Sequence, residues 1–195
     1  MKKISKLIVP FMALSLIWAC SPTPNSSNPT PTQSSKPAGL GTPSATKLND
    51  FVWTKYNLKF KLPSDMKESV NKDDMYEAAN TAVTFQLFPW KNAKLTEEDV
   101  IKEGIKGADN IDKSSFKVSL EDSGTIEIGG LKGYVVSGTA KQSGTDIFLA
   151  VIGLIDPDGS DNFVGYITFD KGKASEDNKN LNVAADIVAS LSKSK

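Results

Sequence analysis

Apolar and polar side chains alternate along several short stretches of the chain, and a period of two is typical of β-strands with one buried face. The clearest example is residues 58–62, where three apolar side chains alternate with two lysines before Pro63 ends the stretch. Similar patterns predict strands over 76–80, 83–88, 116–120, 126–128, 134–137 and 162–170. Residues 147–155 are apolar or glycine throughout, which predicts a central strand covered on both faces.

Two other stretches carry apolar residues at helical spacing. The first begins at Thr96, which is placed to cap a helix, with Asp99 at the reciprocal capping-box position and Leu95 and Val100 as a hydrophobic staple. The second is a final helix whose apolar side chains share one face: Leu181, Ala184, Ala185, Ile187, Val188 and Leu191. The order of strands, helix, strands and helix predicts an α+β fold, an antiparallel β-sheet sandwiched by helices in an α/β/α arrangement.

The first 20 residues have the pattern of an export signal. Three lysines precede the apolar run of residues 7–19, which is too short to span a bilayer because a spanning helix needs about 20 residues. The run ends in Leu-Ile-Trp-Ala-Cys, which resembles the lipobox of bacterial lipoproteins and implies that Cys20 is acylated and becomes the mature N-terminus. An ordinary secretory peptide or a buried structural cysteine are the alternatives. A lone cysteine beside a Pro/Ser/Thr tract favours neither.

The chain therefore divides into three predicted segments. Residues 1–19 form a lipoprotein signal peptide, and residues 20–47 comprise the lipidated Cys20 and a disordered tether. The tether, residues 21–47, contains 6 Pro, 6 Ser and 5 Thr and too few apolar side chains to form a core. Residues 48–195 form the globular domain. Ser21 provides no acidic signal for retention at the inner membrane, so we expect lipid anchoring in the cell envelope, with the outer membrane preferred.

Composition excludes several classes of function. All 23 basic residues are lysines, and the chain has neither His nor Arg, so the usual Ser/His and Cys/His catalytic arrangements are absent. After removal of residues 1–19 the chain has 20 lysines and 23 acidic residues, a formal charge of −3. Such a chain is a poor candidate for nucleic-acid binding, which depends on basic side chains. We expect no catalytic residue and no cofactor.

Two loops are candidates for ligand binding. Asp156, Asp158 and Asp161 have the oxygen density that Ca²⁺ requires, but their spacing differs from that of an EF-hand loop, and Asp-Pro-Asp-Gly is typical of a type I turn. They are a weak metal-site candidate. Residues 129–133 are rich in glycine but join two strands, which favours a turn with positive φ over a phosphate-binding loop.

Aromatic residues near strand ends are the candidates for a partner-binding patch. Phe88 and Trp90 flank a proline where a predicted strand ends, and Trp53 lies in the N-terminal strand. Large aromatics in such positions either pack at the edge of the core or contact a partner. Trp90 is the first choice if the domain has a recognition surface.

Residues 56–66, YNLKFKLPSDM, resemble the opening strand of the PsbP-like superfamily, and L-x-F-x-L-P-x-D-M is similar to the DcrB-like lipoproteins within it. The segments 126–134 and 187–191 fit the same layout, so the resemblance covers about residues 51–195. It implies an antiparallel sheet with helices on both faces and a non-enzymatic binding or assembly role in the bacterial envelope. It implies no catalytic residue.

Two functional hypotheses follow from the sequence. The first is a lipid-anchored domain that binds or assembles an envelope protein partner without catalysis. The alternative is a carrier for a small molecule or ion, with a pocket between sheet and helix. An unusual hydrolase is a third and weaker hypothesis, because the side chains that commonly activate a nucleophile are missing.

Overall fold

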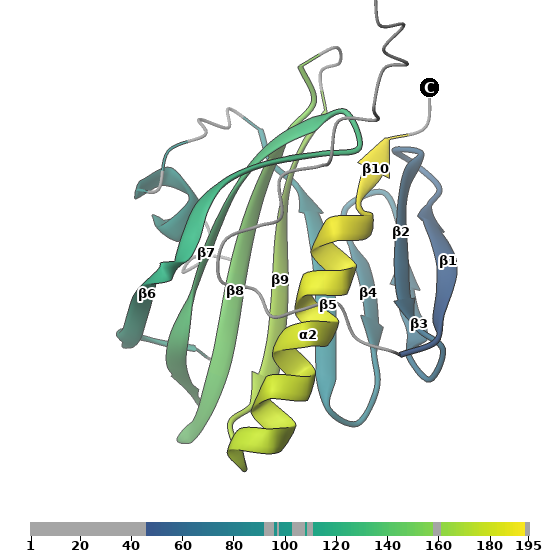
Figure 1. The fold of residues 1–195 in the computed structure, drawn as a ribbon. Coiled ribbons are helices and arrows are strands. Elements are labelled where there is room, and N and C mark those ends of the chain that lie inside the picture. Colours follow the sequence, from purple (N-terminus) through teal and green to yellow (C-terminus); the bar gives the residue numbers. More distant parts are fainter. Residues whose placement is uncertain are drawn as a thin grey trace, which may run out of the picture. The chain divides into compact units, whose positions relative to one another are not determined.

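The computed structural model describes residues 46–91, 96, 98–102, 108, 111–157 and 161–193. Most of them belong to a seven-stranded antiparallel sheet in the order β3-β4-β5-β9-β8-β7-β6 (Figure 1). Its strands are β3 (Lys67–Asn71), β4 (Tyr76–Ala79), β5 (Val83–Pro89), β6 (Ile111–Ile128), β7 (Leu131–Gln142), β8 (Thr145–Ile155) and β9 (Asn162–Asp170). The predicted central strand is therefore β8, which lies between β7 and β9.

A second, three-stranded sheet and a long helix complete the described part of the fold. The small sheet has the order β1-β2-β10 and consists of β1 (Leu48–Trp53), β2 (Leu58–Pro63) and β10 (Ser192–Lys193). The helix is α2 (Ala174–Ser190), which lies across one face of the large sheet (Figure 1). No helix among the described residues is long and apolar enough to cross a membrane.

The large sheet has a hydrophobic core on each face. The core on the α2 side also contains side chains of β2, such as Leu58 and Phe60, and the buried face of α2, such as Ile187 and Val188. The predicted apolar face of the final helix is thus confirmed. On the opposite face, Val100 from the helical residues 98–102 packs among residues of β7, β8 and β9.

The predicted fold class is confirmed in its coarser part. The sheet is antiparallel and carries helix on both faces, but within the described residues strands dominate, and one helix is only the short stretch 98–102. The N-cap bond of this stretch forms as predicted, because the backbone N–H of Asp99 donates to Thr96 Oγ1 at 3.1 Å. Asp99 also contacts Thr96 through its side chain, since the Thr96 hydroxyl donates to Asp99 Oδ2 at 2.6 Å. Leu95 lies outside the described residues. The α2 face is shared with the small sheet, so a regular α/β/α sandwich is not what the described chain shows.

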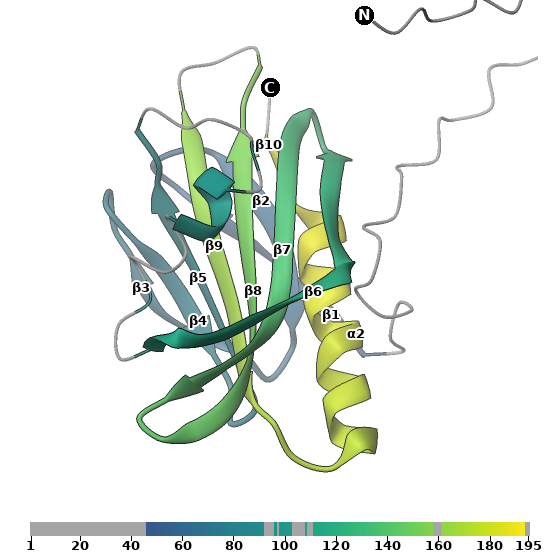
Figure 2. The same cartoon turned by 90° about the vertical axis from the view of Figure 1, so that its left-hand side faces the viewer.

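The strand β6 differs from its prediction. The sequence predicts separate strands over 116–120 and 126–128, whereas the structure has one continuous strand that bends along its length (Figure 2). Its register with β7 shifts twice, between Asp112 and Lys117 and between Ser119 and Gly124. Bulges of this kind break the period of two and bend a strand. The turn to β7 has positive φ at Gly129 and Gly130, as the glycine pattern predicts.

Candidate functional site

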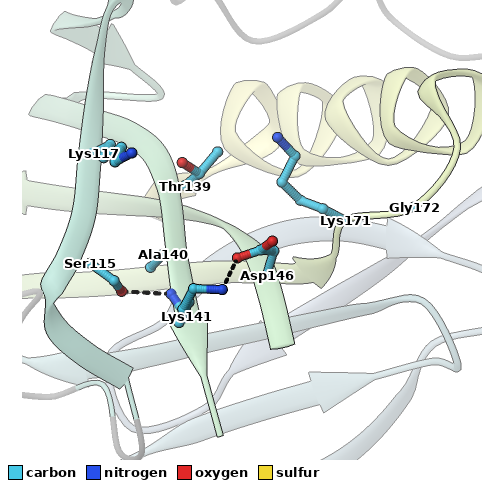
Figure 3. A pocket seen from close by; sticks show the side chains of 8 residues that line it. All are labelled: Ser115, Lys117, Thr139, Ala140, Lys141, Asp146, Lys171 and Gly172. Carbon is cyan, nitrogen blue, oxygen red and sulfur yellow. Dashed lines mark hydrogen bonds and ion pairs between the residues drawn. The ribbon is translucent and has the colours of Figure 1, made fainter. Parts of the chain in front are cut away.

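A cavity of about 470 Å³ lies at the end of the large sheet where the chain passes from β9 into α2 (Figure 3). We call it the lysine pocket. Three lysines contribute to its wall from three different elements. Its lining consists of Ser115 and Lys117 from β6, Thr139, Ala140 and Lys141 from β7, Asp146 from β8, and Lys171 and Gly172 from the connection to α2.

Strand register brings these residues together. Lys117 on β6 stands directly opposite Thr139 on β7, and Lys141 on β7 stands directly opposite Asp146 on β8. Directly opposed residues of antiparallel strands lie on the same face of the sheet, and Thr139 and Lys141 are two positions apart, so all four share one face. The backbone N–H of Lys171 donates to the carbonyl of Asp146 at 2.9 Å, which fixes the last side of the pocket.

The wall formed by β6 and β7 is held by a hydroxyl. The Oγ of Ser115 accepts a hydrogen bond from the backbone N–H of Lys141 at 2.7 Å (Figure 3) and donates one to the carbonyl of Asp112 at 2.6 Å. This bridge lies within the register shift of β6, where the regular ladder is interrupted. Ser115 therefore replaces lost backbone pairing and keeps β6 beside the pocket.

The electrostatics of the lysine pocket favour an anion. Lys141 Nζ pairs with Asp146 Oδ1 at 2.8 Å. Its hydrogen bond and charge hold the pKa of Asp146 below the usual value, and the charges of Lys171 and Lys117 act in the same direction. The ammonium groups of Lys117 and Lys171 have no ion pair or hydrogen bond with any residue that the structure describes. The lining contains three lysines and one carboxylate, an excess of two positive charges within the lining itself. Carboxylates also border it: Asp112 stands directly opposite Lys141, and Asp177 Oδ1 accepts a hydrogen bond from the backbone N–H of Gly172 at 2.9 Å.

This excess runs against the charge of the domain. Residues 48–195 contain 18 lysines and 23 acidic residues, a formal charge of −5. Lysines gathered on one concave surface of an acidic domain attract anionic groups. Lysine ammonium groups bind anions as compact point charges with up to three donors each. The arrangement can therefore hold a phosphate, sulfate or carboxylate group.

The aromatic candidates from the sequence lie mostly in the cores. Trp53 is 0% exposed and donates from Nε1 to the carbonyl of Lys72 at 2.6 Å, while Trp90 is 6% exposed and packs against Gly153. Trp53 belongs to the core on the α2 face and Trp90 to the core on the other face, so the two do not form one patch. Both tryptophans thus pack in the cores, which was one of the two interpretations of their positions; a partner contact at these residues stays a prediction. Phe88 is half-buried against Tyr166, with ring centroids 5.7 Å apart.

The acidic candidates Asp156 and Asp161 lie beside Lys193, which is more than 30 residues away along the chain. Lys193 Nζ lies 2.5 Å from Asp156 Oδ2 and 3.1 Å from Asp161 Oδ2, and Asp158 is outside the described residues. We call these three residues, Lys193, Asp156 and Asp161, the Lys193 cluster. Burial lowers the pKa of Lys193, but the hydrogen bonds and charges of the two carboxylates outweigh this and raise it. The ammonium group takes the place that a bound cation would hold between them.

No other grouping of potential metal ligands replaces this candidate: the described residues contain no set of three or more Asp, Glu, His or Cys side chains placed to hold a metal. Cys20 lies outside the described residues. The lysine pocket itself was missed from the sequence. Its lysines lie singly in different segments of the sequence. Only the alternation of Lys117 with Phe116 and Val118 indicated that this lysine lies on the face opposite the apolar side chains.

Comparisons with known proteins support the fold. No protein-family model and no curated protein sequence matches the chain. The Ran-binding protein Mog1 of Saccharomyces cerevisiae is 9% identical over 75% of this chain and 95% of its own, with a TM-score of 0.53. Mog1 has a PsbP-like fold, so this likeness fits the fold that the sequence resemblance implies. At such identity it shows the fold alone.

Two further solved structures align at lower TM-scores. LpqN of Mycobacterium tuberculosis, a protein involved in cell envelope biogenesis, is 13% identical over 76% of this chain and 91% of its own, with a TM-score of 0.49. A protein of Bacteroides thetaiotaomicron is 16% identical over 78% of this chain, with a TM-score of 0.46. This chain covers 50% of the Bacteroides structure.

Proposed function

We propose that this chain is a lipid-anchored binding protein of the bacterial cell envelope, whose globular domain holds an anionic ligand in the lysine pocket without catalysing a reaction. One observation carries the proposal: the ammonium groups of Lys117 and Lys171 line a cavity of about 470 Å³ and have no partner among the described residues. Lysine side chains that serve only the fold or solubility have no need of a shared concave surface. A ligand that supplies two negative charges would neutralise the local excess.

The envelope location in this proposal is supported by the sequence. The signal-peptide pattern and the lipobox resemblance at Cys20 provide an anchor, because acyl chains contribute about 0.8 kcal/mol of membrane affinity per buried CH₂. Anchoring at the outer membrane agrees with Ser21 in the position after the lipidated cysteine. The resemblance of residues 58–66 to the DcrB-like lipoproteins is part of the same proposal.

The non-catalytic role is supported by the side chains that surround the pocket. Its hydroxyl groups, those of Ser115 and Thr139, have no imidazole to activate them, since the chain contains no histidine. The single carboxylate of the lining, Asp146, is engaged by Lys141. These groups suit binding of an anion and provide no nucleophile with its base.

A protein partner, the first functional hypothesis from the sequence, has less support. Of the three aromatic candidates, only Phe88 offers part of its ring to solvent, and it already packs on Tyr166. Isolated exposed apolar side chains are common on protein surfaces. The alternative hypothesis, a carrier with a pocket between sheet and helix, agrees better with the lysine pocket, which lies where α2 begins.

Calorimetric titration of the full-length chain in detergent with inorganic pyrophosphate at low salt tests the proposal. We expect the wild type to bind pyrophosphate. The double variant Lys117→Ala/Lys171→Ala should bind it about tenfold or more weakly, because each lysine removes a charge-assisted contact worth up to roughly 1.5–3 kcal/mol. Lys132→Ala is the matched control, because Lys132 is an exposed lysine at the other end of β7. Equal affinity of the double variant and the control would contradict the proposal.

A further inference from the structure

A second, smaller cavity of about 150 Å³ lies at the same end of the large sheet. We call it the threonine hollow. Its wall includes Thr84 from β5, Thr168 and Asp170 from β9, and Gln142 from β7. No lysine is among its lining residues.

The lysine pocket and the threonine hollow are formed by consecutive residues at the ends of β7 and β8 and at the junction after β9. Lys141, Asp146 and Lys171 line the lysine pocket, and the residue adjacent to each of them, Gln142, Ile147 and Asp170, lines the threonine hollow. Because successive side chains of a strand point to opposite faces, the two cavities lie back to back across the end of the sheet. A ligand that passes over this end of the sheet would meet both.

The threonine hollow has the chemistry of a site for hydroxyl groups. Thr84 and Thr168 stand directly opposite each other in the β5–β9 register and are half-buried. Neither hydroxyl makes a hydrogen bond with another described residue, and the Asp170 carboxylate has no ion pair among them. Hydroxyls both donate and accept, and a carboxylate accepts, so these groups match a sugar ring better than an anion, which Asp170 would repel.

The surroundings argue against other polyanions. Single-stranded nucleic acids require aromatic platforms and basic grooves, but the chain has no Arg, and the domain has a formal charge of −5. A flat membrane surface would meet the exposed carboxylates Asp146 and Asp170 together with the lysines. A flexible chain of sugars can place neutral and charged groups separately into the two cavities.

We propose that the lysine pocket and the threonine hollow form one binding site for an anionic polysaccharide, with a phosphate or carboxylate group held by Lys117 and Lys171 and an adjacent sugar held by Thr84, Thr168 and Asp170. This inference rests on the proposed function, because it assigns the ligand class of the same lysine pocket. It adds a second subsite that a small anion does not reach.

The test compares charged and neutral probes on the full-length chain in detergent. The probes are phosphomannan and alginate oligosaccharides for the two anionic groups, neutral dextran, inorganic pyrophosphate, and vesicles of phosphatidylglycerol. We expect at least one anionic polysaccharide to bind about tenfold more tightly than pyrophosphate, because the second subsite adds about two hydrogen bonds. Neutral dextran should not bind measurably.

The variant Thr84→Val/Thr168→Val removes the two hydroxyls and keeps the shape and β-propensity of both side chains. It should weaken binding of the anionic polysaccharide about tenfold and leave pyrophosphate binding unchanged, whereas Lys117→Ala/Lys171→Ala should weaken both. Asp170→Asn, at an exposed position, is a second variant of the hollow if the double valine variant fails to fold. It should weaken polysaccharide binding and leave pyrophosphate binding unchanged or tighter.

If the folded variants of the threonine hollow bind the polysaccharide with unchanged affinity, the inference is overturned. The proposed function still stands in that case if pyrophosphate binding depends on Lys117 and Lys171. Binding to phosphatidylglycerol vesicles without binding to either anionic polysaccharide also overturns the inference. Absence of binding to every anionic probe overturns the inference and the proposed function together.

Discussion

The two ends of the strands β8 and β9 each combine lysine with carboxylate, but in different proportions. At one end, the Lys193 cluster places one ammonium group between two carboxylates, at 2.5 and 3.1 Å, and Asp156 is only 8% exposed. At the other end, the lysine pocket has three lysines and one carboxylate, all of them exposed. The first end uses its charges within the fold, whereas at the second the ammonium groups of Lys117 and Lys171 have no ion pair among the described residues.

This difference shows how an ionic group in the structure can be assigned a role. A charge that is matched and enclosed stabilises the fold or fixes its geometry, and replacing it affects unfolding. An unmatched charge on an open concave surface contributes little to stability, and replacing it affects binding. Variants at the two ends of β8 and β9 test this distinction.

The largest effect on stability is expected from Lys193→Met. The substitution leaves Asp156 buried without its ammonium partner, and it removes the side-chain link between β10 and the β8–β9 loop. We expect a loss of about 2 kcal/mol in the free energy of unfolding, below the usual 3–5 kcal/mol for a buried pair because Asp161 is partly exposed. Urea unfolding followed by tryptophan fluorescence measures it.

The control for this prediction is Lys132→Met, since Lys132 is exposed and has no ion pair among the described residues. Adding Asp156→Asn to Lys193→Met should recover part of the loss, because the amide does not leave a buried charge. If Lys193→Met unfolds at the same urea concentration as the wild type, the Lys193 cluster has no structural role of this kind.

Alkaline pH should weaken the same cluster in the wild type. The folded-state pKa of Lys193 is raised above its ordinary value of 10.5, so its contribution to stability is complete below pH 10.5 and is lost as the pH rises through the raised pKa. We expect the difference in unfolding free energy between the wild type and Lys193→Met to be constant below pH 10.5 and to shrink as the pH rises from 10.5 through the raised pKa. A difference that is constant over this range would contradict the ion pair as its cause.

How far the sequence predicts this molecule depends on the range of the interactions involved. The strand over 58–62, the N-cap bond at Thr96 and the turn at Gly129 and Gly130 depend on nearby residues, and the structure confirms them. The strand β3 was missed because its five residues include one apolar side chain and are mostly exposed, so only its pairing with β4 defines it. The two-residue strand β10 exists through its pairing with β2.

The candidate site was harder to predict than the fold. Its lysines belong to β6, β7 and the segment after β9, and the register of the neighbouring strands β6 to β9 brings them together. The spacing of these residues along the chain does not indicate that register. The burial of the two tryptophan candidates was hard to predict for a related reason, because position near a strand end does not say which face a side chain occupies. Trp53 points into the core, where Tyr56 and Phe163 pack against it.

A moderate effect on binding is expected from Asp146→Asn. The substitution removes the one carboxylate of the lysine pocket and releases Lys141, which raises the excess from two to three positive charges. We expect pyrophosphate to bind about threefold more tightly at low salt, and the gain to disappear at about 1 M salt, where the Debye length is about 3 Å. Titration at the two salt concentrations measures the effect.

The contribution of Asp146 to stability depends on pH in the opposite direction to that of Lys193, and Asp146→Asn tests this. Because the folded-state pKa of Asp146 is lowered from 3.8, its contribution to stability is present above pH 3.8 and is lost as the pH falls through the lowered pKa. The amide that Asp146→Asn introduces cannot titrate, so the variant should lack this part of the acid destabilisation. Weaker pyrophosphate binding by Asp146→Asn would show that the carboxylate positions Lys141 for the ligand and is not merely a competing charge.

The smallest effect on stability is expected from Lys117→Ala/Lys171→Ala, the variant with the largest effect on anion binding. Both lysines are exposed and neither has a partner among the described residues, so their removal should change the free energy of unfolding by no more than about 0.5 kcal/mol. The two variants thus distinguish the roles of the two ends of β8 and β9. The double variant should lose anion binding and keep its stability, whereas Lys193→Met should lose stability and keep anion binding. Urea unfolding without ligand, in parallel with the pyrophosphate titration, makes the comparison in one preparation. A loss of stability by the double variant as large as that of Lys193→Met would mean that the lysine pocket serves the fold, and that its open charges do not mark a ligand site.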